Sequence, residues 1–139
     1  MIPELANNLR SHGYDVFDDW HAAGPTADDH WQQYEQQRDR PYNEALRSYP
    51  AEHTWNYDVR HLNRCSMAVL VLPAGKSGHL ELGFAIGLGK PGFILLDKTP
   101  ERWDVMYRFA TVCFTQDELL DELRKNFHIA SEHADARTN

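Results

Sequence analysis

Apolar residues along the chain fall into two patterns, short continuous runs and longer stretches with a helical spacing. The runs lie at 14–17, 67–72, 92–96 and 112–114 and are typical of strands. Helical spacing, caps and breakers predict helices at 2–12, 26–38, 42–49, 51–63, 80–88, 103–109 and from 116 onward. Strands that alternate with helices favour an α/β protein with a mostly parallel sheet covered on both faces. We therefore expect a three-layer, doubly wound fold of the flavodoxin or Rossmann-like kind.

The same pattern predicts details of the packing. The run 67–72 is continuously apolar, which is typical of a strand buried on both faces. Gly83 and Gly87 share one helical face, which predicts a close approach of that helix to the sheet. Thr-Gln-Asp-Glu at 115–118 predicts a capping box for the last helix. Its apolar side chains are expected to face the core: Leu119, Leu120, Leu123 and Phe127.

Length and composition favour one folded domain. The 139 residues have a mass of 16.1 kDa, and 42% of them are hydrophobic, enough for a packed core. We place the domain at 1–127 and expect a polar, frayed C-terminal tail over 128–139. The net charge of −7 argues against a nucleic-acid polymer as partner, because a phosphate backbone attracts a cationic surface.

The apolar runs bear on whether the chain spans a membrane, and the cysteines bear on the redox state of its compartment. The start of the chain lacks a cationic region followed by an apolar stretch, and the longest apolar run, 67–74, is too short to span a bilayer. Cys65 and Cys113 form no Cys-x-x-Cys pair. One disulfide is conceivable, but two separate thiols fit a reducing compartment better. We expect a cytoplasmic protein with no membrane partner.

Several motifs in the chain are incomplete. Gly75-Lys76-Ser77 lacks the earlier glycine that a phosphate-binding loop of the Walker type requires. His79-x-Glu81 begins a zinc deaminase signature, but no Pro-Cys-x-x-Cys follows it. The eight histidines show no metal-ligand spacing, so we expect neither a metal nor a cofactor.

One longer segment carries a resemblance to a known family. Residues 68–95 read as a buried strand, a short Gly/Ser loop, Glu-Leu-Gly-Phe-Ala opening a helix, and Gly-Lys-Pro before a second strand. This order resembles the nucleoside 2-deoxyribosyltransferase family and its relatives that hydrolyse nucleoside monophosphates. With lower specificity the resemblance extends to nearly the whole chain, including 9–17 and Asn56-Tyr57-Asp58.

The resemblance implies that Glu81 is a nucleophile that attacks the anomeric carbon of a nucleoside or nucleotide. We expect this carboxylate in the first turn of its helix, where backbone N–H groups stabilise an anion. Displacement of the base gives a glycosyl ester that a second base or water resolves. The leaving base needs a proton. Asp58 is the expected sugar-orienting or acid/base residue, with Asp18 and Asp19 as weaker alternatives.

Further residues are expected to bind the substrate. Gly75, Ser77 and Gly78 can hold a 5′ group, although the same residues can simply cap the helix. Trp20, next to His21, can wall a base pocket or serve packing alone. Met106 and Tyr107 fall where family members lend a residue to the neighbouring subunit's site. The resemblance therefore implies a homo-oligomer, a dimer or higher.

The family begins with an apolar strand that this sequence lacks. Three explanations stay open: the true start lies upstream, a partner chain fills the gap, or the protein is an inactive descendant. Two other functions also stay open. One is a TIR-like module that cleaves NAD or only assembles with partners. The other is a catalytically silent nucleotide-binding protein.

Overall fold

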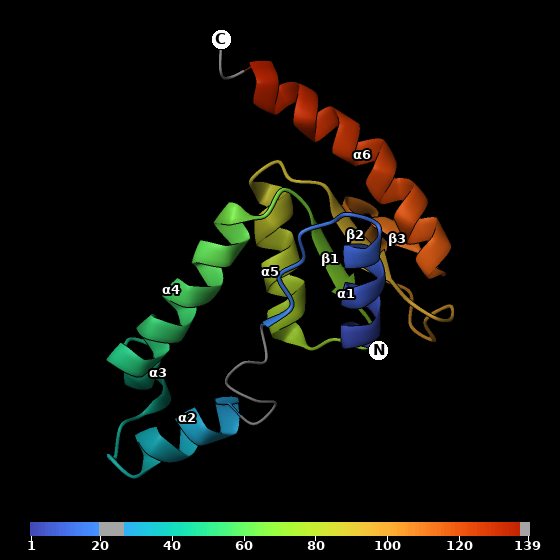
Figure 1. The fold of residues 1–139 in the computed structure, drawn as a ribbon. Helices are drawn as coiled ribbons and strands as arrows, with labels where there is room; N and C mark the ends of the chain where they lie inside the picture. Colours follow the sequence, from blue (N-terminus) through green and yellow to red (C-terminus); the bar gives the residue numbers. More distant parts are fainter. Residues whose placement is uncertain (20–26, 137–139) are drawn as a thin grey trace. The chain divides into compact units, whose positions relative to one another are not determined.

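A computed structural model describes residues 1–19 and 27–136 and, for residues 27 and 128–136, the backbone alone. The chain divides into two compact units, Met1–Asn63 and Arg64–Asn139. The labels of the helices and strands are those of Figure 1. Trp20, His21 and Thr26, which the sequence placed in a substrate pocket and at a helix start, lie outside the described residues.

The second unit holds a three-stranded parallel sheet (Figure 1). Its strands are β1 (Ala68–Val71), β2 (Gly92–Leu95) and β3 (Thr111–Cys113), in the order β1-β2-β3. In the register, Leu70 lies opposite Ile94, which in turn lies opposite Val112. The prediction of an α/β protein with a parallel sheet is confirmed, and three of the expected strands form within two residues of their predicted bounds.

Burial differs between the strands. All four residues of β2 are buried, because this strand is paired on both sides. In β1 only Leu70 is buried, and its neighbours are half-buried. The expectation that the first of these strands is buried on both faces is therefore wrong for the sheet as described. The reason is its position: within the described residues β1 pairs with β2 alone and forms an edge.

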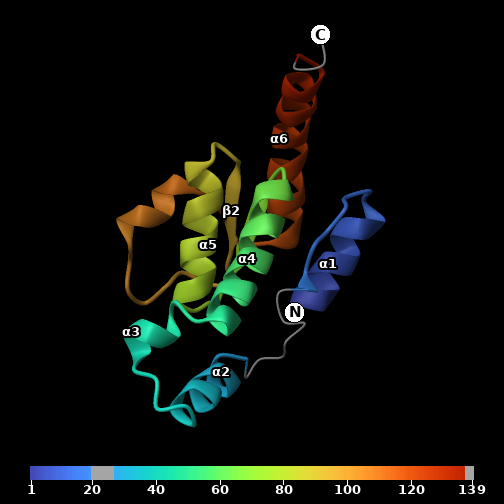
Figure 2. The same ribbon diagram turned by 90° about the vertical axis from the view of Figure 1, so that its left-hand side faces the viewer.

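Two helices pack on this sheet. Helix α5 (Lys76–Gly87) contacts β1 and β2, whereas α6 (Gln116–Ala136) contacts β2 and β3. Figure 2 shows the two helices on opposite sides of β2. A buried cluster joins α5 to the sheet through Leu70, Leu82, Ile94 and Leu96. Because side chains alternate along a strand, Phe93 and Leu95 face the other way, toward the side of α6.

The close approach of α5 to the sheet occurs at other glycines than the sequence indicated. Gly83 and Gly87 are exposed, and a Cβ atom added to either would meet nothing within 4 Å. A Cβ atom on Gly78 would lie 2.9 Å from Leu70 Cδ1, and one on Gly92 would lie 2.6 Å from Ile86 Cγ1 and Cδ1. The prediction for Gly83 and Gly87 is wrong because the helical face that packs on the sheet is the one bearing Leu82.

This difference gives a matched pair of substitutions. Gly92→Ala should lower the free energy of unfolding by about 1–2 kcal/mol, because its new methyl group overlaps Ile86. Gly83→Ala should raise it by up to about 1 kcal/mol, because alanine favours the helix and the space is open. Urea unfolding of both variants measures the difference. Equal effects at the two positions would contradict the packing described here.

The start of α6 confirms the predicted capping box. Thr115 Oγ1 accepts a hydrogen bond from the backbone N–H of Glu118 at 3.1 Å. The Glu118 carboxylate reaches back and accepts from the backbone N–H of Phe114 at 2.7 Å, one residue before the cap. Both bonds satisfy donors that a helix start would otherwise leave without partners.

The rest of α6 departs from two expectations. Leu119, Leu120 and Leu123 are buried as predicted, but Phe127 is 52% exposed, because it lies beyond the part of the helix that the sheet covers. The helix also continues to Ala136, into the segment predicted as a frayed tail over 128–139. Alanine and glutamate in that segment are good helix formers. None of the helices within the described parts of the chain is long and apolar enough to cross a membrane.

The first unit contains four helices among its described residues: α1 (Ile2–Ser11), α2 (Ala27–Gln36), α3 (Tyr42–Ala45) and α4 (Tyr49–Arg64). They confirm the predicted helices with one change, since α3 is shorter and α4 longer than expected. The cause is Pro50, which fits the first turn of a new helix and not the interior of an old one. The predicted single domain over 1–127 stays a prediction.

The strand predicted at 14–17 is not formed. These residues are described without regular structure. The Arg10 guanidinium donates to the backbone carbonyl of Val16 at 3.0 Å and pairs with the Asp18 carboxylate. The Val16 carbonyl, which would accept a hydrogen bond from a neighbouring strand in a sheet, thus accepts one from the Arg10 side chain. The prediction fails because apolar residues become a strand only where a partner strand lies beside them.

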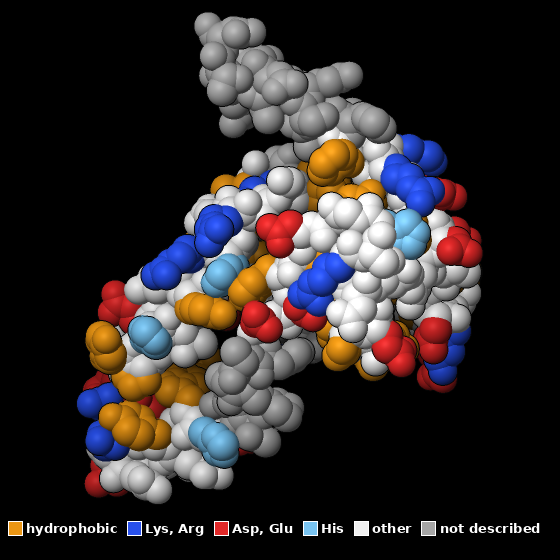
Figure 3. Space-filling view, viewed as in Figure 1, with side chains coloured by type: hydrophobic (Ala, Val, Ile, Leu, Met, Phe, Trp, Pro, Cys, Tyr) orange, Lys and Arg blue, Asp and Glu red, His pale blue; other side chains and the backbone are white. Residues whose placement is uncertain are grey.

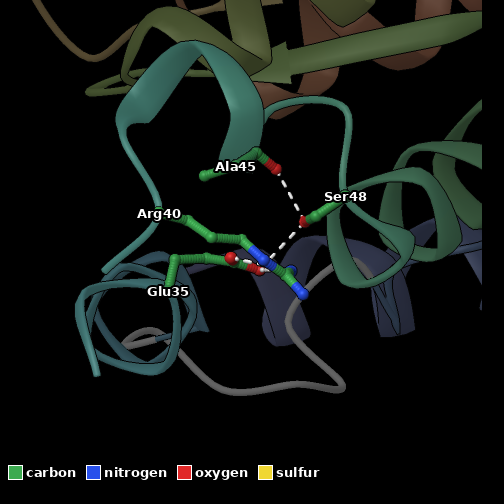
Figure 4. Close-up of polar contacts among 4 residues, drawn as sticks. All are labelled: Glu35, Arg40, Ala45 and Ser48. Carbon is green, nitrogen blue, oxygen red and sulfur yellow. Dashed lines mark hydrogen bonds and ion pairs between the residues drawn. The ribbon is translucent and has the colours of Figure 1, made fainter. Parts of the chain in front are cut away.

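A buried carboxylate ties α2 to the segment that leads into α4 (Figure 4). Glu35 is 2% exposed, and among the described residues it is the buried charged one. Arg40 Nη1 lies 3.1 and 3.4 Å from its two carboxylate oxygens, and Ser48 Oγ lies 2.9 Å from Oε1. Ser48 Oγ is also 2.7 Å from the Ala45 carbonyl, so its single proton serves one acceptor at a time.

Candidate functional site

The candidate nucleophile lies one turn deeper in its helix than the sequence suggested. Helix α5 begins at Lys76, with Gly75 as its N-cap, so Glu81 falls in the second turn. The expectation that Glu81 lies in the first turn, where the helix dipole acts, is therefore wrong. The reason is that Lys76, Ser77 and Gly78, which resemble a loop in the sequence, are already helical. Glu81 is half-buried.

The expected 5′-group residues surround the start of α5. Gly75 and Ser77 are exposed, whereas Gly78 is half-buried against Leu70. They follow the carboxyl end of β1, the edge at which parallel sheets bind ligands. Gly75 is thus the N-cap of α5, and Ser77, Gly78 and Glu81 lie in the first two turns of this helix, shortly after the edge of the sheet.

Tyr107 lies beside this stretch, although it is distant from it in sequence. It belongs to the 3-10 helix η2 (Val105–Phe109), and its hydroxyl lies 2.9 Å from His79 Nε2. His79 Nδ1 lies 2.8 Å from the carbonyl oxygen of Gly75. Met106, the other residue predicted from this region, is 58% exposed. Its backbone N–H is bonded to Asp104, the N-cap of η2.

The contact of His79 with Tyr107 is not predicted by the sequence, where His79 belongs only to the incomplete zinc deaminase motif. No local spacing indicates a partner 28 residues away. The available signal is Tyr107 itself, which the resemblance singles out.

Asp58 lies in the first unit, in the second half of α4, and is half-buried. Burial raises the pKa of the Asp58 carboxyl above its ordinary value; nearby His61 lowers it in part, and Asp28 raises it further. A carboxyl group whose pKa is raised retains its proton more readily, which suits a general acid.

Aromatic rings surround this part of α4. Tyr49, His53, Tyr57 and His61 follow one another at four-residue intervals, which places them on one helical face. The His61 ring stacks on Phe17 at 3.7 Å between centroids and meets Tyr57 edge-on at 4.6 Å. Figure 3 shows histidine and hydrophobic side chains along this helix. Asp58 therefore directly follows Tyr57 in α4 and lies three residues before His61, the ring that stacks on Phe17.

Burial of Asp58 gives a stability prediction. The folded state holds the Asp58 proton more tightly than the unfolded chain, whose pKa is about 4. The contribution of Asp58 to the stability of the native state therefore falls as the pH rises above about 4. Asp58→Asn should unfold at higher denaturant concentration than the wild type at pH 7, by less than about 1 kcal/mol because the group is partly solvated. The difference should vanish near pH 3, and a variant less stable by the same amount at both pH values would contradict it.

Asp18 and Asp19 differ in their surroundings. Asp18 is half-buried and forms an ion pair with Arg10 beside the end of α1. Asp19 is exposed, and Trp20 lies outside the described residues.

None of the predicted site residues lines the two hollows found in the first unit. One, of about 370 Å³, is lined by Tyr34, Arg40, Glu44, Ser48, Tyr49 and Pro50. The other, of about 440 Å³, is lined by Leu46, Arg47, Ala51, Glu52 and Trp55. Within the described residues, no group of three or more His, Cys, Asp or Glu side chains is arranged to hold a metal ion. The two cysteines form no disulfide.

The chain was compared with known protein families, curated proteins and solved structures. None of them matches it. Its function is therefore argued from the residues and the geometry alone.

Proposed function

We propose that the protein is a nucleoside 2-deoxyribosyltransferase-like enzyme that cleaves the N-glycosidic bond of a nucleoside or nucleoside monophosphate. The observation that carries the proposal is the placement of Glu81. This carboxylate is half-buried near the start of the helix that follows a parallel strand, next to an exposed glycine- and serine-containing stretch. That edge of a parallel sheet is where ligands bind in such folds.

In the first step, one carboxylate oxygen of Glu81 attacks C1′ of the sugar. A C1′–O ester bond forms as the C1′–N bond breaks, and the electron pair leaves with the base nitrogen. Asp58 is the proposed proton donor to that nitrogen. Its raised pKa supports this role, because burial makes the Asp58 carboxyl hold its proton more tightly than a fully solvated carboxyl group does.

In the second step, the nitrogen of another base or the oxygen of water attacks C1′. The ester bond breaks, and its electron pair returns to the Glu81 carboxylate. The proton lost by the attacking group goes to Asp58, which restores both residues to their starting states. Two displacements at C1′ retain the configuration of the sugar.

The proposal includes the finer features of the fold. We propose that the three strands belong to a doubly wound sheet whose first strand is missing, and that the protein forms a homo-oligomer. Among the residues that the structure describes, β1 is paired on one side only, which supports the missing strand, because a further strand of the family's sheet would pair on its other side. The apolar composition of 67–72 is also that of an interior strand.

The proposed function is tested by following release of the free base by chromatography. The purified chain is incubated with a panel of ribo- and deoxynucleosides and their 5′-monophosphates, with and without a second base. Base release in at least one case supports the proposal, and a new nucleoside formed only with the second base identifies transfer. The same panel includes NAD. Release of nicotinamide alone would replace the proposal with a TIR-like activity.

A silent nucleotide-binding protein is separated from an enzyme by calorimetry on the same panel. Tight binding of a nucleotide without turnover during long incubation would overturn the enzymatic proposal. Absence of both binding and turnover for every member would overturn the assignment to nucleosides as a class.

A further inference from the structure

Two hydrogen bonds connect η2 to the loop before α5 through one imidazole. The Tyr107 hydroxyl lies 2.9 Å from His79 Nε2, and His79 Nδ1 lies 2.8 Å from the Gly75 carbonyl oxygen. The rings of Tyr107 and His79 stack with centroids 5.7 Å apart and planes inclined by 21°. The three residues therefore form a continuous chain of contacts within the second unit.

The chemistry of the acceptor fixes the direction of both bonds. A carbonyl oxygen only accepts, so Nδ1 of His79 must carry the hydrogen. In the neutral imidazole Nε2 then has a lone pair and no hydrogen, and the Tyr107 hydroxyl donates to it. The arrangement is a one-way chain from Tyr107 O–H to Nε2, and from Nδ1–H to the Gly75 oxygen.

This chain of hydrogen bonds adds to the packing of Ala74, which holds the same loop against the buried cluster. Gly75 and Ser77 are exposed, and the other bond to the Gly75 carbonyl, from the backbone N–H of His79, is long at 3.4 Å. Tyr107, by contrast, packs against the buried cluster of Leu70, Leu82, Ile94 and Leu96. The imidazole thus connects an exposed glycine to a side chain that packs on the core.

We propose that Tyr107 and His79 are positioning residues that hold residues 73–78, the loop before α5 and the first turn of that helix, in the shape that receives the substrate's 5′ group. This inference rests on the proposed function. It also assigns Tyr107 to its own chain, because its hydroxyl is bonded to His79 of the same chain. The resemblance had placed this region at the neighbouring subunit's site.

The kinetic test uses variants that remove one bond at a time. Tyr107→Phe keeps the ring and removes the donor to Nε2, while His79→Asn keeps an N–H near the position of Nδ1. Each should raise KM about fivefold and leave kcat within about twofold, because a misplaced loop weakens binding. His79→Leu removes both bonds and should raise KM further. Tyr42→Phe and His53→Asn, at exposed positions, are the matched controls.

A second measurement does not depend on activity. Long-range ¹H–¹⁵N NMR near pH 8 should show His79 with its hydrogen on Nδ1, and Tyr107→Phe should shift the Nε2 resonance. Amide hydrogen exchange over 75–79 should be at least about fivefold faster in Tyr107→Phe than in the wild type.

The outcomes separate this inference from the proposed function. A hydrogen on Nε2, or unchanged exchange in Tyr107→Phe, overturns the positioning role whatever the activity. The expected tautomer and faster exchange, with no substrate cleaved by the wild type, support the loop contact while the proposed function fails. A drop in kcat at unchanged KM would also overturn the inference, because Tyr107 would then act in the chemical step.

Discussion

Glu81→Gln should release base from its best substrate at least about a thousandfold more slowly than the wild type. Glutamine is close to glutamate in size, so α5 and its buried residues Leu82 and Ala85 should keep their packing. The neutral amide cannot form the glycosyl ester, and removal of a nucleophile typically costs this much or more. Initial rates of base release by chromatography measure the effect.

Two further experiments make the result specific to Glu81. Glu101→Gln changes the charge equally at an exposed position of the same unit and should keep the wild-type rate within about twofold. Mass spectrometry of the intact, rapidly quenched protein should show a sugar adduct on the wild type and none on Glu81→Gln. Activity retained by Glu81→Ala would refute the nucleophilic mechanism.

Glu35→Ala should lower the free energy of unfolding of the first unit by about 3 kcal/mol. The substitution removes a buried carboxylate that two partners share, Arg40 and Ser48. Loss of one member of a buried ion pair costs about 3–5 kcal/mol. The lower end applies here, because Arg40 is 39% exposed and water can solvate it.

Urea unfolding followed by tryptophan fluorescence measures this effect. Three of the four tryptophans lie in the first unit, at positions 20, 31 and 55, so the signal reports mainly on it. Glu35→Gln retains an oxygen that can accept from Ser48 and should cost less than Glu35→Ala. Glu52→Ala, an exposed glutamate of α4, should stay within about 0.5 kcal/mol of the wild type. A Glu35→Ala variant as stable as Glu52→Ala would show that the buried ion pair contributes nothing.

The sequence predicted those elements whose cause is local. The runs at 67–72 and 92–96 form strands because continuous apolar residues suit a buried position in a parallel sheet. The capping box at Thr115 forms because its two partners are three residues apart. Each of these signals lies within a few residues, so no knowledge of the tertiary structure was needed.

The predictions that failed depended on distant partners. The segment 14–17 needed a neighbouring strand, and Arg10 took its carbonyl instead. The start of α5 was misplaced because glycine and serine at 75–78 favour a loop in isolation, whereas packing of Gly78 on Leu70 favours the helix. Tertiary contacts likewise decide which face of α5 meets the sheet. Periodicity alone therefore could not tell whether Gly83 or Gly78 lies at the close approach to the sheet.

The candidate site was predicted only where its residues are neighbours in the sequence. Glu81 and the loop before it are contiguous, so one motif identified them. The contact of His79 with Tyr107 joins residues 28 positions apart and has no local signature. The raised pKa of Asp58 arises from burial, which the sequence of α4 does not reveal because polar residues surround it.

The missing side chain of Gly92 has a consequence for how β2 aligns with β1. Gly92 faces Ala68 in the ladder, and Ile86 of α5 fills the space that its missing side chain leaves. If β2 slipped by one residue, Phe93 would have to occupy that space, and every side chain of the strand would change faces. The glycine therefore acts as a register lock: it allows one alignment of β2 beneath α5 and makes the neighbouring alignment sterically prohibitive.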